Sequence, residues 1–356
     1  MNRPIVLGAG PAGSVAALLL AEGGAEPILI DRDAEVRDAI CGGFLSWRTA
    51  EGLKRLGCDP ATLGARPVTR LRLFAGRRTA EAPLPQMAYG LSRHLLDGAL
   101  RQLAIAKGAR FEVDRARRVA PGFIEGERRR WESPAIFLAT GKHDVRGERR
   151  PRATNNPALG LRVRLPPSAQ LERLIGAAIE LHLFPGGYAG IVLQEGGSAN
   201  VCLALRKSAL AKAGGDPLEA LQGVVRDNPH FARRMAHAED RLPIDTIGAV
   251  PYGWIAKETE EGLYRLGDQA AVIPSLAGEG MAIALASGEA AAQSYLQGQG
   301  ASQYQRSFAR RAAQPVGVAK LLWHMAETSS GALAMTVASR IVPAFAELAM
   351  RMSRIH

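Results

Sequence analysis

The sequence predicts an α/β fold: a parallel-sheet domain, an inserted antiparallel β-sheet and a helical C-terminal segment. Three observations lead to this prediction. A strand, a glycine-rich turn and a helix open the chain, and a similar strand and turn return near residue 264. Between them, residues 156–249 contain short apolar runs separated by Gly and Pro turns, which is typical of antiparallel strands.

Composition places the chain among ordinary globular proteins. Of its 356 residues, 47% are hydrophobic and 22% are charged, which excludes disordered and fibrous classes. The net charge of +11 suits nucleic acid, an anionic membrane or an acidic ligand. The arginines are scattered, however, with local clusters only at 128–130 and 146–152, and aromatic residues are 5% of the chain. We therefore interpret them mainly as solvated surface and do not expect a nucleic-acid partner.

Cysteine and apolar patterns indicate a cytoplasmic protein. Cys41, Cys58 and Cys202 form neither a C-x-x-C pair nor an even disulfide framework. The histidines are isolated, so no metal site is expected. No apolar window is long enough to span a membrane, because glycines and a proline interrupt residues 5–21. Peripheral contact with a membrane stays open as an addition to a cytoplasmic location.

The N-terminal elements form a βαβ opening. Residues 4–7 suit a buried strand, residues 8–13 a turn, and residues 11–22 an Ala/Leu-rich helix that ends at Gly23-Gly24. A second buried strand over 27–30 ends at Asp31.

The turn Gly8-Ala9-Gly10-Pro11-Ala12-Gly13 is a G-x-G-x-x-G string. Its first glycine makes the turn, its second lets a pyrophosphate approach the backbone, and its third lets the helix pack on the strand. The helix N-terminus then offers free N–H groups and a positive dipole to phosphates. Because Asp31 stands where an acid accepts from ribose hydroxyls, the sequence predicts a Rossmann dinucleotide-binding domain.

Later elements divide the chain. We expect helices over 48–56 and 93–107, strands over 71–74 and 135–138, and helices again from residue 304. This predicts a discontinuous nucleotide-binding domain over 1–75, 90–155 and 250–300, a β-rich substrate domain over 76–89 and 156–249, and a helical segment over 301–356.

A second motif distinguishes a flavin from a nicotinamide. Leu266-Gly267-Asp268 ends a late strand, and Pro274 leads through Gly278-Glu279-Gly280-Met281 into a helix. This resembles the second flavin-binding motif of glutathione-reductase-type FAD proteins. The resemblance implies that Asp268 binds a ribitol hydroxyl and that the helix N-terminus faces the pyrimidine end of the flavin, where its dipole would stabilise the anionic reduced form.

Within that superfamily the chain resembles the branch of the geranylgeranyl-reductase-like proteins and the p-hydroxybenzoate-hydroxylase-type (group A) monooxygenases. The resemblance rests on residues 40–46, Ile-Cys-Gly-Gly-Phe-Leu-Ser, on residues 274–291, and on the helix beginning Arg93-His94-Leu95-Leu96-Asp97, whose arginine in the family lies near the FAD. Residues 139–146 depart from the monooxygenase motif D-G-x-x-S-x-x-R, since Thr140 replaces the aspartate and Asp144 the serine. Residues 185–193 keep Pro185 and Tyr188 of the reductase motif P-x-x-Y-x-W-x-F-P, but Gly190 replaces its tryptophan.

These motifs define the candidate site. We expect FAD to be bound by Gly8, Gly10, Pro11, Ala12, Gly13, Asp31, Arg32, Cys41, Gly42, Arg93, Thr140, Gly141, Gly267, Asp268, Gly278, Gly280 and Met281. Cys41 is a candidate proton donor beside the flavin, and Tyr188 is a candidate catalytic residue in the substrate cavity; both also fit a purely packing role.

The prediction is an FAD-dependent oxidoreductase that takes electrons from NAD(P)H, since the flavin carries the chemistry and no protein nucleophile is needed. The missing reductase tryptophan favours a monooxygenase acting on an apolar or phenolic small molecule. The alternative is a reductase of an isoprenoid or lipid double bond, and a remote alternative is a non-catalytic flavoprotein in a nucleic-acid-associated complex. The tail either packs on the domain, caps the cavity, or meets a membrane through Lys320, Arg340, Arg351 and Arg354.

Overall fold

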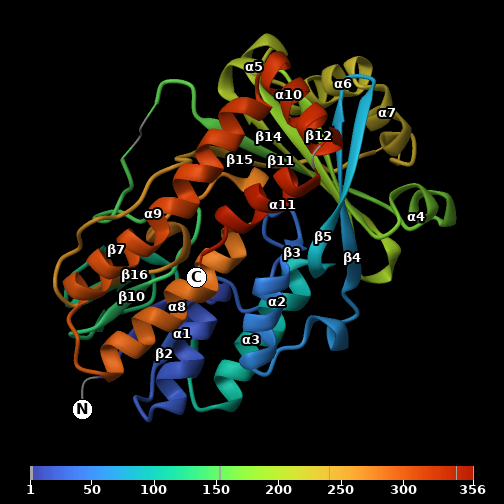
Figure 1. Ribbon diagram of the computed structural model, residues 1–356. Coiled ribbons are helices and arrows are strands. Elements are labelled where there is room, and N and C mark those ends of the chain that lie inside the picture. The colour runs from blue at the N-terminus through green and yellow to red at the C-terminus, as the bar shows by residue number, and fades with distance from the viewer. Residues whose placement is uncertain (1–2, 152–153, 240, 342, 356) are drawn as a thin grey trace.

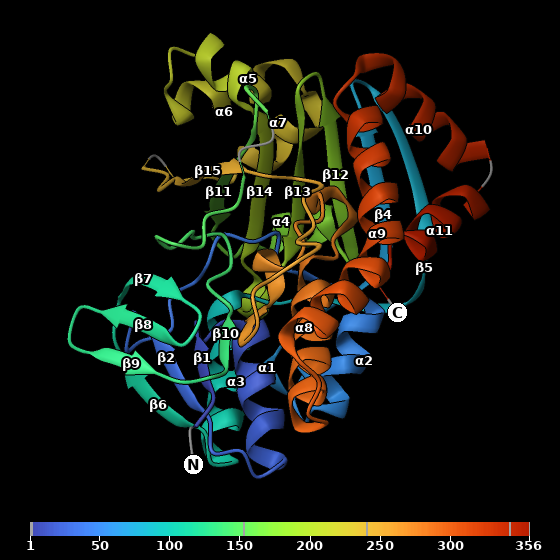
Figure 2. The ribbon, with the colours of Figure 1, turned by 90° about the vertical axis from the view of Figure 1, so that its left-hand side faces the viewer.

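The computed structural model describes residues 3–151, 154–239, 241–341 and 343–355. Two sheets and three long C-terminal helices make up its framework (Figure 1). A five-stranded parallel sheet and an eight-stranded sheet each carry their own helices, and the C-terminal helices run along both (Figure 2).

The parallel sheet has the order β16-β10-β1-β2-β6, with β1 (Ile5–Leu7), β2 (Ile28–Asp31), β6 (Arg110–Val113), β10 (Ile136–Leu138) and β16 (Leu263–Arg265). Its central strands are short and wholly apolar because both faces are covered. Helix α1 (Pro11–Glu22) packs against α8 (Gly280–Leu296) and α3 (Arg93–Ala106). The predicted βαβ opening and α/β class are confirmed.

Two further helices begin where the sequence supplies a cap. Ser46 accepts from the backbone N–H of Thr49 at the start of α2 (Trp47–Arg55), and Ser92 accepts from Leu95 at the start of α3. A small three-stranded sheet follows, formed by β7 (Ala116–Ala120), β8 (Phe123–Gly126) and β9 (Arg130–Glu132).

The eight-stranded sheet has the order β15-β11-β14-β13-β12-β4-β5-β3. Its strands are β3 (Phe44–Leu45), β4 (Arg66–Ala75), β5 (Arg78–Gly90), β11 (Ala158–Leu165), β12 (Ala178–Phe184), β13 (Gly187–Leu193), β14 (Ala199–Arg206) and β15 (Asp245–Val250).

Two expectations about this sheet need correction. It is mixed rather than purely antiparallel, because β12 pairs with β4 in parallel. The proposed boundary after residue 75 also falls inside the β4–β5 hairpin, so residues 66–75 belong to this sheet and not to the parallel-sheet domain. A short turn over 76–77 joins the two strands, and strand pairing across such a turn outweighs a boundary drawn from composition.

Helices cover the face of this sheet that points away from the parallel domain. They are α4 (Ala169–Ile175), α5 (Lys207–Lys212), α6 (Pro217–Asp227) and α7 (Pro229–Met235). Leu171, Leu221 and Phe231 bury this layer against the strands.

The C-terminal segment is helical, as predicted, with α9 (Ala301–Ala326), α10 (Ser329–Ile341) and α11 (Pro343–Met352). Helix α9 packs on α8, whereas α10 lies on β4 and β5 and α11 on β5 (Figure 2). Among the described residues, every helix is too short or too polar to cross a bilayer.

Candidate FAD and substrate site

A cavity of about 980 Å³ lies between the parallel domain, the eight-stranded sheet and the C-terminal helices. All the residues predicted to bind FAD line it except Gly13, and Tyr188 lines it as well. Its lining brings together the two FAD motifs, which are more than 250 positions apart in the sequence. Whether each residue contacts the cofactor stays a prediction.

The glycine turn is packed too tightly for side chains. A Cβ on Gly13 would stand 1.9 Å from the carbonyl oxygen of Gly8, and one on Gly8 would stand 2.4 Å from that of Ala139. Gly13 therefore allows the close packing within the turn and does not line the cavity. Gly10 caps α1 without a side-chain hydrogen bond, and no acidic residue occupies the first helical turn. The helix N-terminus is left available for an anion.

Two charged groups flank this turn. The backbone N–H of Ala9 donates to Asp31 Oδ2 at 2.7 Å, which ties the end of β2 to the turn. Arg93 donates to both carboxylate oxygens of Asp97 at 2.6 Å. Burial alone would lower the pKa of Arg93, but Asp97 raises it. A fixed cation thus stands beside Gly10, with Arg93 Nη2 3.5 Å from where its Cβ would be.

The second motif lies against the first. Gly267 has φ +57° and donates its N–H to Ser287 Oγ at 2.7 Å. A Cβ on Gly288 would stand 2.5 Å from the carbonyl oxygen of Ala12, so α8 approaches α1 closely. Asp268 lines the cavity, and its carbonyl accepts from Arg150 at 3.1 Å.

These residues fit FAD. The cradle has room only for glycine at Gly8 and Gly13, while a Cβ on Gly42, Gly141 or Gly280 would meet open space. The donor set also matches, since free helix N–H groups and Arg93 suit the pyrophosphate and two carboxylates suit the hydroxyls of ribose and ribitol.

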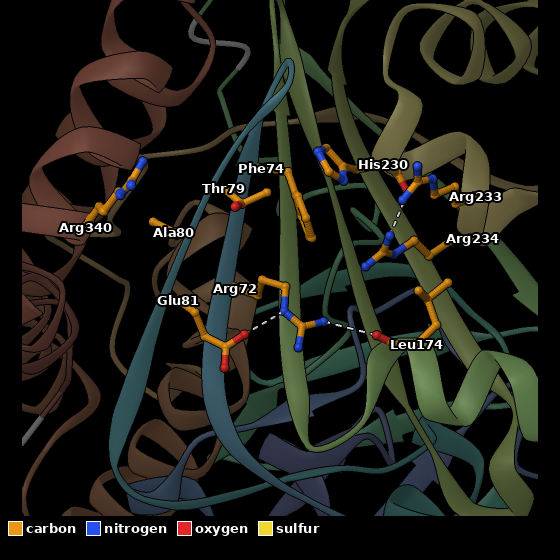
Figure 3. Close-up of a pocket in the computed structure, with 10 residues that line it drawn as sticks. All are labelled: Arg72, Phe74, Thr79, Ala80, Glu81, Leu174, His230, Arg233, Arg234 and Arg340. Carbon is orange, nitrogen blue, oxygen red and sulfur yellow. Dashed lines mark hydrogen bonds and ion pairs between the residues drawn. The ribbon is translucent and has the colours of Figure 1, made fainter.

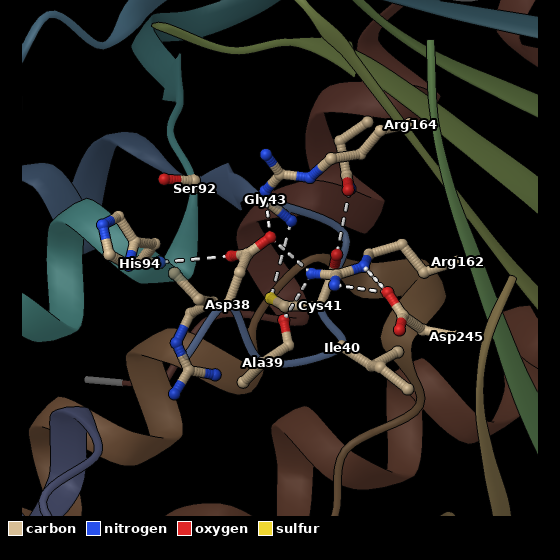
Figure 4. A network of polar contacts seen from close by, with 12 residues as sticks. Asp38, Ala39, Ile40, Cys41, Gly43, Ser92, His94, Arg162, Arg164 and Asp245 are labelled. Atoms are coloured by element: carbon tan, nitrogen blue, oxygen red, sulfur yellow. Dashed lines mark hydrogen bonds and ion pairs between the residues drawn. The ribbon is translucent and has the colours of Figure 1, made fainter. Parts of the chain in front are cut away.

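The loop that carries Cys41 is held by side chains that bind its backbone (Figure 4). Asn200 donates to the carbonyls of Cys41 and Gly42 at 2.9 and 2.8 Å, and Lys142 donates to that of Ile40 at 2.7 Å. Arg162, itself buried, donates to Asp38 at 2.6 Å and to the carbonyl of Ala39 at 3.1 Å. Three strands or loops distant in sequence therefore fix the position of Cys41 in the cavity wall.

Two thiols line the cavity. Cys41 is half-buried, with the N–H of Gly43 3.5 Å from its sulfur, and Cys202 faces the same space from β14. Burial raises the pKa of Cys202 to about 11, so this thiol stays protonated at neutral pH. The structure thus places the predicted proton donor at the cavity, together with a second thiol that sequence reasoning missed.

Tyr188 is buried and donates to Ser275 Oγ at 2.7 Å, and Tyr252 shares the same hydroxyl. Burial raises the pKa of both phenols, so both are neutral hydrogen-bonding groups at neutral pH. Both rings also meet the edge of Trp323 in α9.

Sequence reasoning missed several residues of this site. Lys142, Asn200 and Ser275 line it or hold its loops, and they come from a turn, a β-strand and a short helical turn. Lys142 and Ser275 had a signal, because they lie inside the motif segments 139–146 and 274–291, whereas Asn200 lies in a strand without a recognisable motif.

Comparison with known proteins supports this assignment. Residues 3–120 match the model of an FAD binding domain family. The chain is 30% identical over 315 residues to digeranylgeranylglycerophospholipid reductase 2 of Methanopyrus kandleri, covering 81% of this chain and 75% of that protein. It is 26% identical to the corresponding reductase of Methanocella arvoryzae, with the same coverage.

Solved structures share the fold. The flavin-dependent brominase Bmp2 matches with a TM-score of 0.78 and 14% identity, over 99% of this chain and 93% of that one. A geranylgeranyl bacteriochlorophyll reductase-like protein of Thermoplasma acidophilum matches with a TM-score of 0.70 and 18% identity, over 98% of both chains. The chain carries both FAD motifs, shares this fold and is similar to these reductases over 81% of its length. It therefore belongs to the FAD-dependent oxidoreductase family that contains the geranylgeranyl-reductase-like proteins and the group A flavoprotein monooxygenases.

Proposed function

We propose that this oxidoreductase reduces a carbon–carbon double bond of an isoprenoid or lipid. The observation that carries the proposal is the apolar wall of the flavin cavity. Leu71, Leu73, Ile179, Leu181 and Leu203 line it from the eight-stranded sheet, and Leu322, Met335 and Met350 from the tail. Such a wall favours a long apolar substrate over a small polar one. The similarity to two prenyl-lipid reductases supports the same choice.

The chain's residues would bind and protonate this substrate. Bound FAD supplies hydride chemistry. The eight-stranded sheet and the tail exclude water and orient the apolar chain. Cys41 Sγ carries the proton that completes saturation of the second carbon, and the bonds from Asn200 and Lys142 hold the backbone that carries this side chain.

A monooxygenase of an apolar or phenolic molecule is the second candidate. The hydroxyl cluster of Tyr188, Tyr252 and Ser275 favours it, because a phenolic substrate could hydrogen-bond there within an otherwise apolar cavity. Gly190, in the place of the reductases' tryptophan, leaves space beside this cluster.

NAD(P)H is the electron donor we propose for either reaction. We do not assign residues that dock NAD(P)H from the monooxygenase motif, because Asp144 of this chain pairs with the buried Arg150 at 2.6 Å. Another reduced carrier that restores turnover where NADH and NADPH fail would contradict this part of the proposal.

Oxygen dependence separates the two reactions. The FAD-loaded protein is supplied with NADPH or dithionite and an unsaturated prenyl phospholipid, with and without oxygen. A product that gains two hydrogens without oxygen supports reduction, whereas one oxygen atom taken from labelled dioxygen supports hydroxylation.

Cys41→Ser tests the proton donor. We expect it to lower the rate of product formation without loss of FAD. Cys58→Ser is the matched control, because Cys58 is buried among Leu53 and Leu100, away from the cavity.

We also propose that the protein meets a membrane surface through α10 and α11. Ile341 is 71% exposed and Leu348 56% exposed, and Arg340 stands beside Ile341. Ser339 lines the flavin cavity while Arg340 lines a separate pocket of about 630 Å³. In that pocket Arg233 and Arg340 are exposed, whereas Arg72 and Arg234, beside Phe74, are paired with the buried Glu180 (Figure 3). Basic groups beside exposed apolar side chains suit an anionic lipid surface.

One residue of the original membrane prediction has to be withdrawn. Arg354 is buried, unlike Lys320, Arg340 and Arg351, so it cannot contact a bilayer. The remaining proposal is tested by sedimentation with phosphatidylglycerol vesicles and with phosphatidylcholine vesicles. Ile341→Ser with Leu348→Ser should abolish binding to the anionic vesicles, whereas Leu218→Ser, an exposed leucine of α6, should not. Equal binding by both variants would contradict it.

A further inference from the structure

Residues 353–355 are buried against the FAD motifs. Arg354 is 2% exposed, Ser353 is 2% exposed, and both line the flavin cavity. Ile355 joins the core between α1, α8 and α9. An arginine is almost never fully buried unless it is paired, so the burial of Arg354 needs a partner.

Arg354 contacts two segments of the cofactor site. It forms an ion pair with Glu279, and its Nη1 donates to the carbonyl of Ala277 at 3.3 Å. Its guanidinium carbon lies 4.3 Å from the centre of the Trp47 ring. Ala277 and Glu279 belong to the second FAD motif, and Trp47 directly follows the loop that carries Cys41. One side chain thus joins the two loops.

The charge of Glu279 makes this contact important. Glu279 is fully buried and directly precedes Gly280, which begins α8 and lines the cavity. An uncompensated carboxylate there would oppose the positive end of the helix dipole and disfavour negative charge on a bound flavin. Burial and the nearby Arg48 lower the pKa of Arg354 to about 9. Glu279 is the carboxylate that faces the Arg354 guanidinium and compensates its charge.

We infer that Arg354 is a positioning residue that completes the FAD site from the C-terminus. It neutralises Glu279 and fixes the loops over 274–280 and 41–47 around the cofactor. FAD affinity and the reduction potential of the bound flavin therefore depend on Arg354. The inference rests on FAD binding and on neither proposed reaction.

The test uses the full-length protein and measures two quantities besides activity. FAD dissociation constants come from fluorescence titration of the apoprotein, and reduction potentials come from equilibration with reference dyes. Arg354→Met keeps the packing on Trp47 but removes the charge. We expect FAD to bind at least tenfold more weakly, because removing one partner of a buried ion pair leaves the other unpaired. We also expect a more negative reduction potential.

Matched variants separate electrostatics from folding. Arg354→Met with Glu279→Gln removes both charges and should return the potential toward that of the parent protein. Arg351→Met is the control, because Arg351 is an exposed residue of α11 that pairs with Glu347. If Arg354→Met alone does not fold, the double variant and Glu279→Gln are compared with the parent, and Glu279→Gln should move the potential in the positive direction. The inference is overturned if Arg354→Met and Glu279→Gln both leave the reduction potential of the bound flavin unchanged. Where Arg354→Met does not fold, an unchanged reduction potential in Glu279→Gln alone overturns it.

Discussion

At the scale of single residues, the site depends on side chains that bind backbone groups. Asp31 accepts from Ala9, Asn200 binds two carbonyls of the Cys41 loop, and Arg93 is oriented by Asp97. The bonds of Asp31 and Asn200 fix loops that have little secondary structure of their own, whereas the Asp97 bond orients a side chain within α3. Because a lost hydrogen bond in a buried site costs about 1–3 kcal/mol, such residues should affect cofactor binding more than global stability.

Asp31→Ala is the sharpest test at this scale. It removes the acceptor for the Ala9 N–H and the predicted acceptor for the ribose hydroxyls of FAD, so we expect FAD binding to weaken by about 1–3 kcal/mol. Titration of the apoprotein measures this change. Glu26→Gln, at an exposed ion pair with Arg3, is the control and should bind FAD like the parent protein. Equal affinity for FAD in the Asp31 and Glu26 variants would argue against the predicted role of Asp31.

At the scale of elements, the contact between α1 and α8 brings the two FAD motifs together. Gly288 faces the carbonyl of Ala12, and Ser287 binds the N–H of Gly267. Neither contact involves a large side chain, so small residues on both helices allow the close approach.

Gly288→Ala should destabilise the protein by about 1–3 kcal/mol, since its Cβ would stand 2.5 Å from the Ala12 oxygen. Gly98→Ala on α3 is the opposite case. A Cβ there meets nothing within 4 Å, so replacing a helical glycine should stabilise by up to about 1 kcal/mol. Denaturant unfolding measures the free energy of unfolding of both variants. If this free energy changes in the same direction in both, the contact between α1 and α8 is looser than described.

Strand β12 carries a buried carboxylate that makes stability depend on pH. Glu180 accepts from Arg72 and Arg234 at 2.6–2.8 Å. Burial would raise the pKa of Glu180, but hydrogen bonds from His182 and Arg234 lower it to about 2. Burial also lowers the pKa of His182 below 6.5.

Both shifts predict acid sensitivity. A carboxyl with a lowered pKa contributes stability above its unfolded value of 4.5, and this is lost as the pH falls toward 2. The unfolded chain also takes up a proton on His182 as the pH falls through 6.5, which lowers stability further. Urea unfolding between pH 7 and pH 3 should show declining stability. Glu180→Gln should be less stable at pH 7 and show a flatter decline below pH 4.5; an equally steep decline would assign the acid sensitivity to other groups.

At the scale of the whole molecule, many of the arginines are neutralised in surface ion pairs with glutamates. Arg70 with Glu81, Arg110 with Glu112 and Arg130 with Glu132 are examples. The arginine-rich pocket beside α10 is a local concentration and not a long groove.

We therefore expect only non-specific binding to nucleic acid. Random duplex DNA should bind with a dissociation constant of about 1 μM or weaker at physiological salt, with the affinity falling steeply as salt rises. Fluorescence anisotropy across a salt series measures this. Tight binding that resists salt would favour the remote alternative of a nucleic-acid-associated flavoprotein.

The sequence by itself determined the cofactor and the fold class. The spacing of Gly8, Gly10 and Gly13, and the pair Gly267-Asp268, follow from backbone geometry that few other residues allow, so they can be interpreted without a structure. Only the tertiary structure decided that residues 66–75 join the eight-stranded sheet and that Arg354 is buried against Glu279. Strand partners and ion pairs join residues far apart in the chain, and their energies depend on packing that no local pattern records.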